Sequence, residues 1–244
     1  MRCGALIASP MNILITGASR GIGAAAYALL TKTGHKAVGH STRGSDVLIA
    51  GDLTDPAAPR DIWDTALDEL GGEIDVLVNN AGIYEGVADN VSDEEWHSAW
   101  QRTLTINLQS AADLSRLAVS HFLDRGGGGR IVNVASRAAF RGDSPQHWHY
   151  AASKAAMVGM TRTIARGYAG DGILCFAVAP GFTVSEMTAD YLQGRGGAQI
   201  VADIPLGRVA STDEIAEVIR WLSIDAPASA TGSVIDANGA SYVR

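Results

Sequence analysis

The stretch TGASRGIG, residues 16–23, decides the fold, because it joins an apolar run to a helical pattern. Residues 12–16 predict a buried strand, and residues 22–33 predict a helix that ends before Gly34. Glycines at 17, 21 and 23 leave the turn without Cβ atoms, so backbone N–H groups could approach a pyrophosphate at the positive end of the helix. The turn therefore predicts a dinucleotide site, the alternative being a tight turn with chance glycines.

The alternation of strand and helix continues along the chain. Further apolar runs typical of strands lie at residues 35–41, 46–52, 75–82, 130–136, 173–180 and 233–239. Further helical patterns lie at residues 56–71, 93–124, 150–168 and 213–223. The pattern at 93–124 is expected to be broken at most once. We predict an α/β fold, a single doubly wound (Rossmann-like) parallel sheet with helices on both faces. It should span residues 11–244, with residues 1–10 as a loose N-terminal extension.

The composition indicates which kinds of binding partner the protein disfavours. The 244 residues carry a net charge of −7, whereas nucleic acids and anionic membranes attract basic surfaces. No apolar run approaches the roughly 18 residues of a membrane span. The two cysteines, Cys3 and Cys175, form no disulfide framework, which favours a reducing cytoplasm. We therefore expect a cytoplasmic protein that binds neither nucleic acid nor membrane.

A second motif, YAASK at residues 150–154, contains residues that could transfer a proton. Tyr150 and Lys154 stand four positions apart, so on a helix they would share one face. An ammonium beside a phenol lowers the pKa of the phenol, which would give a proton donor and acceptor near neutral pH. Taken alone, the motif is equally typical of an amphipathic helix with a solvated lysine.

These motifs together resemble the short-chain dehydrogenase/reductase family, with its TGxxxGxG and Y-x-x-x-K, and in particular members similar to 3-oxoacyl-ACP reductases. Further matches, in order along residues 12–240, are DL at 52–53, NNAG at 79–82, Asn107 in TINLQS, Ser136, PG at 180–181, and residues 205–219. One departure is the spacing from Ser136 to Tyr150, which is 14 positions, one more than the resemblance leads us to expect.

The resemblance implies hydride transfer between NAD(P) and a carbonyl or alcohol carbon. Tyr150 would deliver the proton, and Ser136 would hold the carbonyl oxygen. Lys154 would lower the pKa of Tyr150 and bind the nicotinamide ribose, and Asn107 would position a water that links Lys154 to solvent.

The resemblance also implies the residues that contact the cofactor. They are Gly17, Ser19, Arg20, Gly21, Ile22, Gly23, Ser41, Thr42, Arg43, Asp52, Leu53, Asn79, Ala81, Gly82, Tyr150, Lys154, Pro180, Gly181, Thr183 and Ser185. Ser185 stands where the family often has threonine, and it keeps the hydroxyl.

The end of the second strand predicts which cofactor is preferred. An NAD site places an acid there to bind the ribose hydroxyls, and that acid repels a 2′-phosphate. Here no acid precedes Asp46, while Ser41, Thr42, Arg43 and Arg20 could donate hydrogen bonds to a phosphate. NADP(H) is therefore the predicted cofactor, and NAD(H) is the alternative if Asp46 reaches the ribose.

The substrate pocket is harder to predict. His147 and His149, at i and i+2, do not share a helix face, and we predict no metal site. Residues expected at the carboxyl edge of the sheet could border the substrate or be ordinary loop residues. They are Tyr84, Phe140, His147, Trp148, Phe182, Met187 and Tyr191.

The predicted function is an NAD(P)-dependent oxidoreductase acting on a small-molecule ketone or secondary alcohol. Because fold does not dictate function, the alternatives are a non-catalytic cofactor sensor or scaffold, or an epimerase or dehydratase that uses the same site. A sensor has no need of a proton donor, so the four residues Asn107, Ser136, Tyr150 and Lys154 favour the enzyme. The resemblance further implies a homo-oligomer, a dimer or tetramer.

Overall fold

The computed structural model describes residues 9–183 and 197–244, and within these ranges seven strands form one parallel sheet. The strands are β1 (Asn12–Ile15), β2 (Lys36–Ser41), β3 (Leu48–Ala50), β4 (Val76–Asn79), β5 (Gly129–Val134), β6 (Ile173–Pro180) and β7 (Val234–Ala237). Their order is β3-β2-β1-β4-β5-β6-β7, with every neighbouring pair parallel. The predicted doubly wound sheet is confirmed. The order reverses between β1 and β4, where such folds bind ligands beyond the carboxyl ends of the strands.

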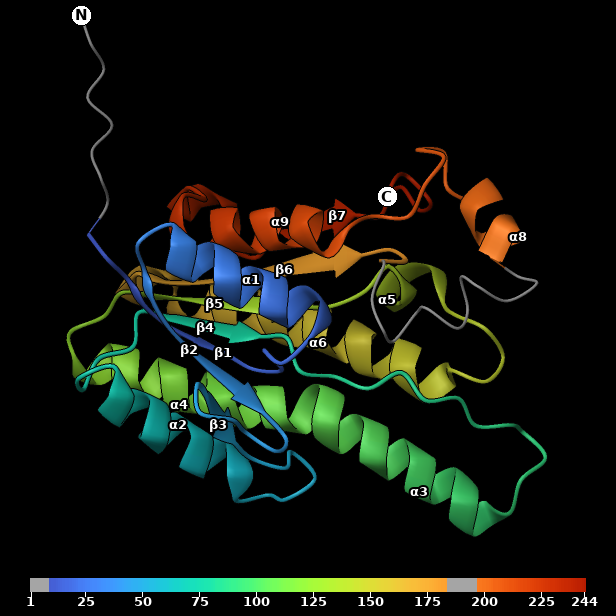
Figure 1. Cartoon of the computed structure of the whole chain (residues 1–244), viewed down its shortest axis with the longest axis horizontal. Coiled ribbons are helices and arrows are strands. Elements are labelled where there is room, and N and C mark those ends of the chain that lie inside the picture. The colour runs from blue at the N-terminus through green and yellow to red at the C-terminus, as the bar shows by residue number, and fades with distance from the viewer. Residues whose placement is uncertain (1–8, 184–196) are drawn as a thin grey trace, which may run out of the picture.

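Helices cover both faces of this sheet (Figure 1). On one face lie α1 (Gly21–Lys32) and α9 (Thr212–Ile224), and on the other lie α2 (Ala58–Glu69), α4 (Ser110–Asp124) and α6 (Trp148–Tyr168). Side chains alternate across a strand, so Ile13 and Ile15 of β1 are buried with the first pair of helices and Leu14 with the others. Burial on both faces explains why the strands read as nearly continuous apolar runs.

The predicted helix at residues 93–124 is broken once. It consists of α3 (Asp93–Leu104), a π-helical turn η1 (Thr105–Gln109) and α4. The structure also contains elements that the sequence did not predict, because each is too short to show a period: α5 (Ala138–Arg141), α8 (Gly197–Ala202), and the 3-10 turns η2 (Ala169–Asp171) and η3 (Ala228–Ala230). None of the helices in the described ranges is long and apolar enough to cross a membrane.

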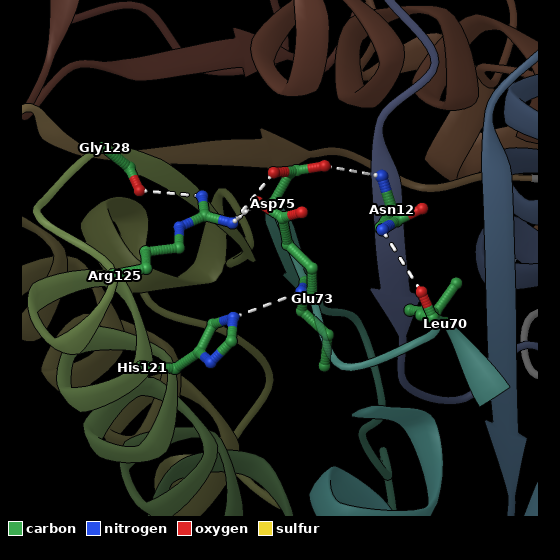
Figure 2. A network of polar contacts seen from close by, with 8 residues as sticks. Asn12, Leu70, Glu73, Asp75, His121, Arg125 and Gly128 are labelled. Atoms are coloured by element: carbon green, nitrogen blue, oxygen red, sulfur yellow. Dashed lines mark hydrogen bonds and ion pairs between the residues drawn. The ribbon is translucent and has the colours of Figure 1, made fainter. Parts of the chain in front are cut away.

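A polar network ties the amino ends of β1 and β4 to the end of α4 (Figure 2). Asp75 directly precedes β4; its Oδ1 lies 2.9 Å from Arg125 Nη1, and its Oδ2 accepts a 2.8 Å hydrogen bond from the Asn12 backbone N–H. His121 Nε2 accepts from the Ile74 backbone N–H at 3.2 Å. These contacts hold the edge of the sheet opposite to the one that carries the candidate site.

Candidate active site

A cleft of about 360 Å³ opens at the carboxyl edge of the sheet, between the β1–α1 turn, the ends of β2, β4, β5 and β6, and the first turns of α6. It brings together most of the predicted cofactor residues. They are Gly17, Ser19, Arg20, Gly21, Ile22, Gly23, Ser41, Thr42, Asp52, Leu53, Ala81, Gly82, Tyr150, Lys154, Pro180, Gly181 and Thr183. Residues far apart in the sequence thus line one cleft at the point where the strand order reverses.

The glycine-rich turn is packed too tightly for side chains. Gly17 has φ of 68°, and a Cβ there would lie 2.8 Å from Ala81 Cα. A Cβ on Gly23 would collide with Gly17 O and Asn80 Nδ2. Asn80 Nδ2 donates to the carbonyls of Thr16 and Gly17 at 2.9 and 3.1 Å, so it links the turn to the end of β4. The turn therefore offers its backbone to the cleft at the start of α1, as a pyrophosphate would require.

His40, which the sequence analysis did not single out, contacts this turn through the Gly17 backbone. It is buried and lines the cleft at the end of β2. Its Nδ1 accepts a hydrogen bond from the Gly17 N–H at 3.4 Å, and its Nε2 lies 2.9 Å from Gly51 O, so we assign the tautomer with the proton on Nε2. Burial lowers the pKa of His40 below its ordinary 6.5, which keeps the ring neutral and Nδ1 able to accept.

Two predicted cofactor residues lie elsewhere. Asn79, the last residue of β4, is buried away from the cleft, and its Nδ2 donates to Asn133 Oδ1 at 2.9 Å and to Ser115 Oγ at 3.0 Å. Its predicted cofactor contact is wrong, because alternation along the strand leaves Asn80 on the cleft side. Arg43 is exposed in the β2–β3 connection and does not line the cleft.

The four predicted catalytic residues gather at one end of the cleft. Ser136, just after β5, and Tyr150 and Lys154, one turn apart on α6, all line it. Lys154 Nζ lies 5.8 Å from the centroid of the Tyr150 ring. These positions are the ones that the Y-x-x-x-K spacing predicts.

Asn107 lies directly behind this group, in the π-helical turn. Its Oδ1 accepts from the Ile83 N–H at 2.8 Å, and its Nδ2 donates to Ile83 O at 3.0 Å. A Cβ built on Gly82 would lie 3.2 Å from Asn107 Oδ1 and 3.6 Å from Lys154 Nζ, so both side chains approach the same backbone. The extra residue of a π turn re-aims a side chain within a helix, which explains the break that the sequence only suggested.

Burial sets the protonation of Tyr150 and Lys154. It raises the pKa of Tyr150 to about 12, opposed by the hydrogen bond with Ser136. It lowers the pKa of Lys154 to about 8, and the ammonium donates to Val134 O at 2.8 Å. The net shift of the Tyr150 pKa is thus upward, because desolvation of the phenol dominates, whereas the ammonium of Lys154 alone was expected to lower it.

Of the predicted substrate residues, Tyr84 and Phe182 line the cleft. The Tyr84 ring stands edge-on to Tyr150, with centroids 4.8 Å apart, and its hydroxyl donates to Asp143 Oδ1 at 2.9 Å. His147 does not line the cleft, because it is buried and stacks against the far side of Tyr84 at 3.9 Å. Tyr84 thus contacts both Tyr150 at the reacting end of the cleft and the buried His147.

Trp148 and Phe140 also lie outside the lining. Trp148 is largely exposed and packs edge-on against Trp96 of α3 at 5.3 Å. Phe140 lies under Arg244, whose Cζ is 4.0 Å from the ring centroid. The predicted residues Ser185, Met187 and Tyr191, and nearly all of the predicted N-terminal extension, lie outside the described residues.

The cleft contains lining residues that sequence reasoning missed. They are His40, Asn80, Ile83, Arg102, Ile106, Val134, Ala135, Arg137 and Asp143. Arg137 could have been found, since it directly follows Ser136, and Asp143 lies in the loop before Tyr150. Among residues 9–183 and 197–244, no group of three or more His, Cys, Asp or Glu side chains could hold a metal ion.

Comparisons with known proteins place this arrangement in context. The model of a family described as short chain dehydrogenase matches residues 11–196. The chain is 36% identical over 243 residues to the 3-oxoacyl-(acyl-carrier-protein) reductase FabG of Escherichia coli (strain K12), covering 94% of this chain and 96% of that protein.

Solved structures show the same similarity. A structure described as that of an NAD(P)-dependent gluconate 5-dehydrogenase from Beutenbergia cavernae, with NADP bound at low occupancy, is 33% identical with a TM-score of 0.83, covering 94% of this chain and 95% of the other. A short chain dehydrogenase from Burkholderia cenocepacia in complex with NADP is 27% identical with a TM-score of 0.85, covering 95% and 97%.

Proposed function

This chain belongs to the short-chain dehydrogenase family and is an NAD(P)-dependent oxidoreductase of ketones or secondary alcohols, and we propose that Tyr150 is its general acid and base. The observation that carries the proposal is that Ser136, Tyr150 and Lys154 line the cleft opened by the glycine-rich turn, with Tyr150 and Lys154 one turn apart on α6. The comparisons favour this function over a cofactor sensor, a scaffold, an epimerase or a dehydratase.

The roles follow from the positions of the side chains. The hydroxyls of Ser136 and Tyr150 would hold the carbonyl oxygen of the substrate, where negative charge develops during reduction. Tyr150 would donate the proton to that oxygen as the general acid. Lys154 would bind the cofactor ribose, and Asn107 would hold the Ile83 backbone behind it and position a water.

The residues fit a dinucleotide. The absence of Cβ atoms at Gly17 and Gly23 leaves a backbone cradle at the amino end of α1, which suits a pyrophosphate. When bound, the nicotinamide supplies the hydride for reduction. The cradle and the proton donor open on one cleft, so a single ligand could span the distance between them.

We propose NADP(H) as the preferred cofactor and NAD(H) as the alternative. Ser41 and Thr42 at the end of β2 and Arg20 in the β1–α1 turn line the cleft, whereas Asp46 does not. Since Arg43 also lies outside the lining, Arg20 is the cation on which the preference now rests. Arg20→Ala should weaken NADPH binding by about 10- to 100-fold, the value of one charge-assisted contact, and hardly change NADH binding. An equal effect on both cofactors would contradict the preference.

The replacement Tyr150→Phe tests the function. It keeps the ring and removes the transferable proton, so kcat with a panel of ketones and alcohols should fall by about 10²–10⁴-fold while the Kd for NADPH stays unchanged. Tyr168→Phe, at the other end of α6 and outside the cleft, is the matched control and should leave kcat unchanged. A Tyr150→Phe protein that keeps more than about a tenth of wild-type kcat would show that another group supplies the proton.

Further properties complete the proposal. One sheet runs from Asn12 to Ala237, which supports one domain over residues 11–244. The thiol of Cys175 is buried and free, in keeping with a cytoplasmic location. Family resemblance supports a homo-oligomer, a dimer or tetramer, and light scattering of the purified protein measures its mass.

A further inference from the structure

Arg137 is a buried cation in the cleft that the reaction described above does not use. It directly follows Ser136, and its backbone N–H donates to Pro180 O at 3.0 Å, which fixes it at the carboxyl ends of β5 and β6. Its side chain is only 8% exposed, yet it lines the same cleft as Ser136 and Tyr150. The charge therefore lies at the substrate end of the cleft, next to a residue that would hold the reacting oxygen.

The guanidinium is poorly satisfied by the protein. Its Cζ lies 4.9 Å above the ring centroid of Phe182, and its Nη1 is buried without a hydrogen-bond partner among the described residues. Asp143 acts on it electrostatically, but Asp143 Oδ1 already accepts hydrogen bonds from the Tyr84 hydroxyl at 2.9 Å and the Ser144 N–H at 2.7 Å. Arg137 Nη1 is thus a hydrogen-bond donor for which the described residues supply no acceptor.

Other partly buried arginines of this chain are satisfied. Arg130 Nη1 donates to Leu222 O at 3.0 Å and Ala226 O at 2.9 Å, and Arg125 pairs with Asp75 at 2.9 Å. Burying a guanidinium without such partners is unfavourable, because the charge loses its hydration. The contrast indicates that the Arg137 position serves a ligand rather than the stability of the fold.

We propose that Arg137 binds the carboxylate of the substrate, so that the substrate class is an oxo acid and the corresponding hydroxy acid; this inference rests on the oxidoreductase function proposed above. A planar guanidinium matches a carboxylate with two parallel hydrogen bonds, and the Arg137 guanidinium, which lies over the Phe182 ring, lines the cleft. The Asp143 carboxylate lines the same cleft and would repel a doubly charged group, which favours a carboxylate over a phosphate.

The kinetic test compares substrates that differ only in this charge. Acetoacetate and pyruvate are each paired with their methyl esters, and kcat/KM is measured with NADPH. We expect the wild type to prefer each acid by at least about 10-fold, and Arg137→Met to lower kcat/KM for the acids by about 10- to 100-fold while the esters change less than about threefold. Arg137→Lys, which keeps the charge without the planar fork, should retain part of the preference.

Arg141→Met is the matched control, because Arg141 is exposed, lies outside the cleft and pairs with Asp203 at 3.2 Å. It should leave the ratio of acid to ester unchanged. A wild type that prefers the esters, or an Arg137→Met protein in which acids and esters fall equally, would overturn the assignment. So would a fall in Tm of more than about 5 °C in Arg137→Met, since that outcome assigns the side chain to stability.

Binding separates this inference from the proposed function. Calorimetric titration of acetoacetate and its methyl ester into NADPH-loaded Tyr150→Phe protein, with and without Arg137→Met, needs no turnover. Tighter binding of the acid that depends on Arg137, together with a wild type that reduces no carbonyl compound, would support the anion site and refute the reductase. Turnover without any difference between acid and ester, in kinetics or in binding, would refute the anion site and leave the reductase standing.

Discussion

Replacing Lys154 with methionine should make this protein more stable and less active. Lys154 is 4% exposed, and among the described residues its ammonium makes one hydrogen bond, to Val134 O at 2.8 Å. Burial lowers the pKa of Lys154 from 10.5 to about 8. At about 1.36 kcal/mol per pH unit, this difference corresponds to about 3 kcal/mol of unfavourable desolvation at pH 7. Loss of the bond to Val134 O offsets about 1 kcal/mol of it, so Lys154→Met should gain about 2 kcal/mol.

The gain should depend on pH in a defined direction. Below about pH 8 the lysine is charged in the folded and unfolded states, and the full desolvation term opposes folding. Between about pH 8 and 10.5 the folded protein releases the proton while the unfolded chain keeps it, so the stability of the wild type rises with pH. The advantage of Lys154→Met should therefore be largest at pH 7 and vanish as the pH approaches 10.5.

Urea unfolding at intervals from pH 7 to 10 measures this difference, and the comparison of wild type with variant cancels the other groups that titrate. Lys32→Met, an exposed lysine of α1, is the matched control and should change the free energy of unfolding by less than about 0.5 kcal/mol. A Lys154→Met protein that is less stable than the wild type at pH 7, or a difference that stays constant across this range, would refute the reasoning.

Other predictions follow from the packing. Gly23→Ala should abolish NADPH binding measured by fluorescence titration, because its Cβ would collide with Gly17 O; unchanged affinity would contradict the cradle. His40 has its pKa lowered by burial, so the wild type should lose stability as the pH falls below about 6.5, and His40→Gln should lose less over the same thermal-unfolding series. Asp75→Ala should lower the free energy of unfolding by about 1–3 kcal/mol, since it removes one ion pair of Arg125 and the acceptor of the Asn12 N–H, while kcat stays unchanged; an inactive but stable variant would contradict this separation.

Local geometry explains what the sequence could predict. The strand at 12–16, the glycine-rich turn and the helix that carries Tyr150 and Lys154 each depend on neighbours along the chain, through alternation, absent Cβ atoms and helical spacing. The order of such elements, together with the family resemblance, was enough to predict the sheet and the location of the cleft. The short helices α5 and α8 fall below the length at which a period can be read.

Contacts between distant residues explain what it could not. Whether Asn79 or Asn80 faces the cleft depends on the pleat at the end of β4 and on the partners Asn133 and Ser115. The role of His40 requires the Gly17 turn and the chain after β3 to meet it. The pKa of Tyr150 is raised, whereas the spacing to Lys154 alone predicted a lower value, because other segments of the chain bury the phenol.

Charged side chains are paired at the amino ends of the strands and poorly paired at the carboxyl ends. This difference separates residues that stabilise the fold from residues that serve function. At the amino edge Asp75 pairs with Arg125 and with the backbone of Asn12, so removal of either partner leaves a polar group unsatisfied. At the carboxyl edge Lys154 and Arg137 are buried with few protein partners, an arrangement that opposes folding. Features that break a local rule of stability cluster at functional sites. Neutral substitutions at Lys154 and Arg137 should therefore preserve or raise Tm while they lower activity or the preference for acids, and Asp75→Ala at the amino edge should lower the stability and leave activity unchanged.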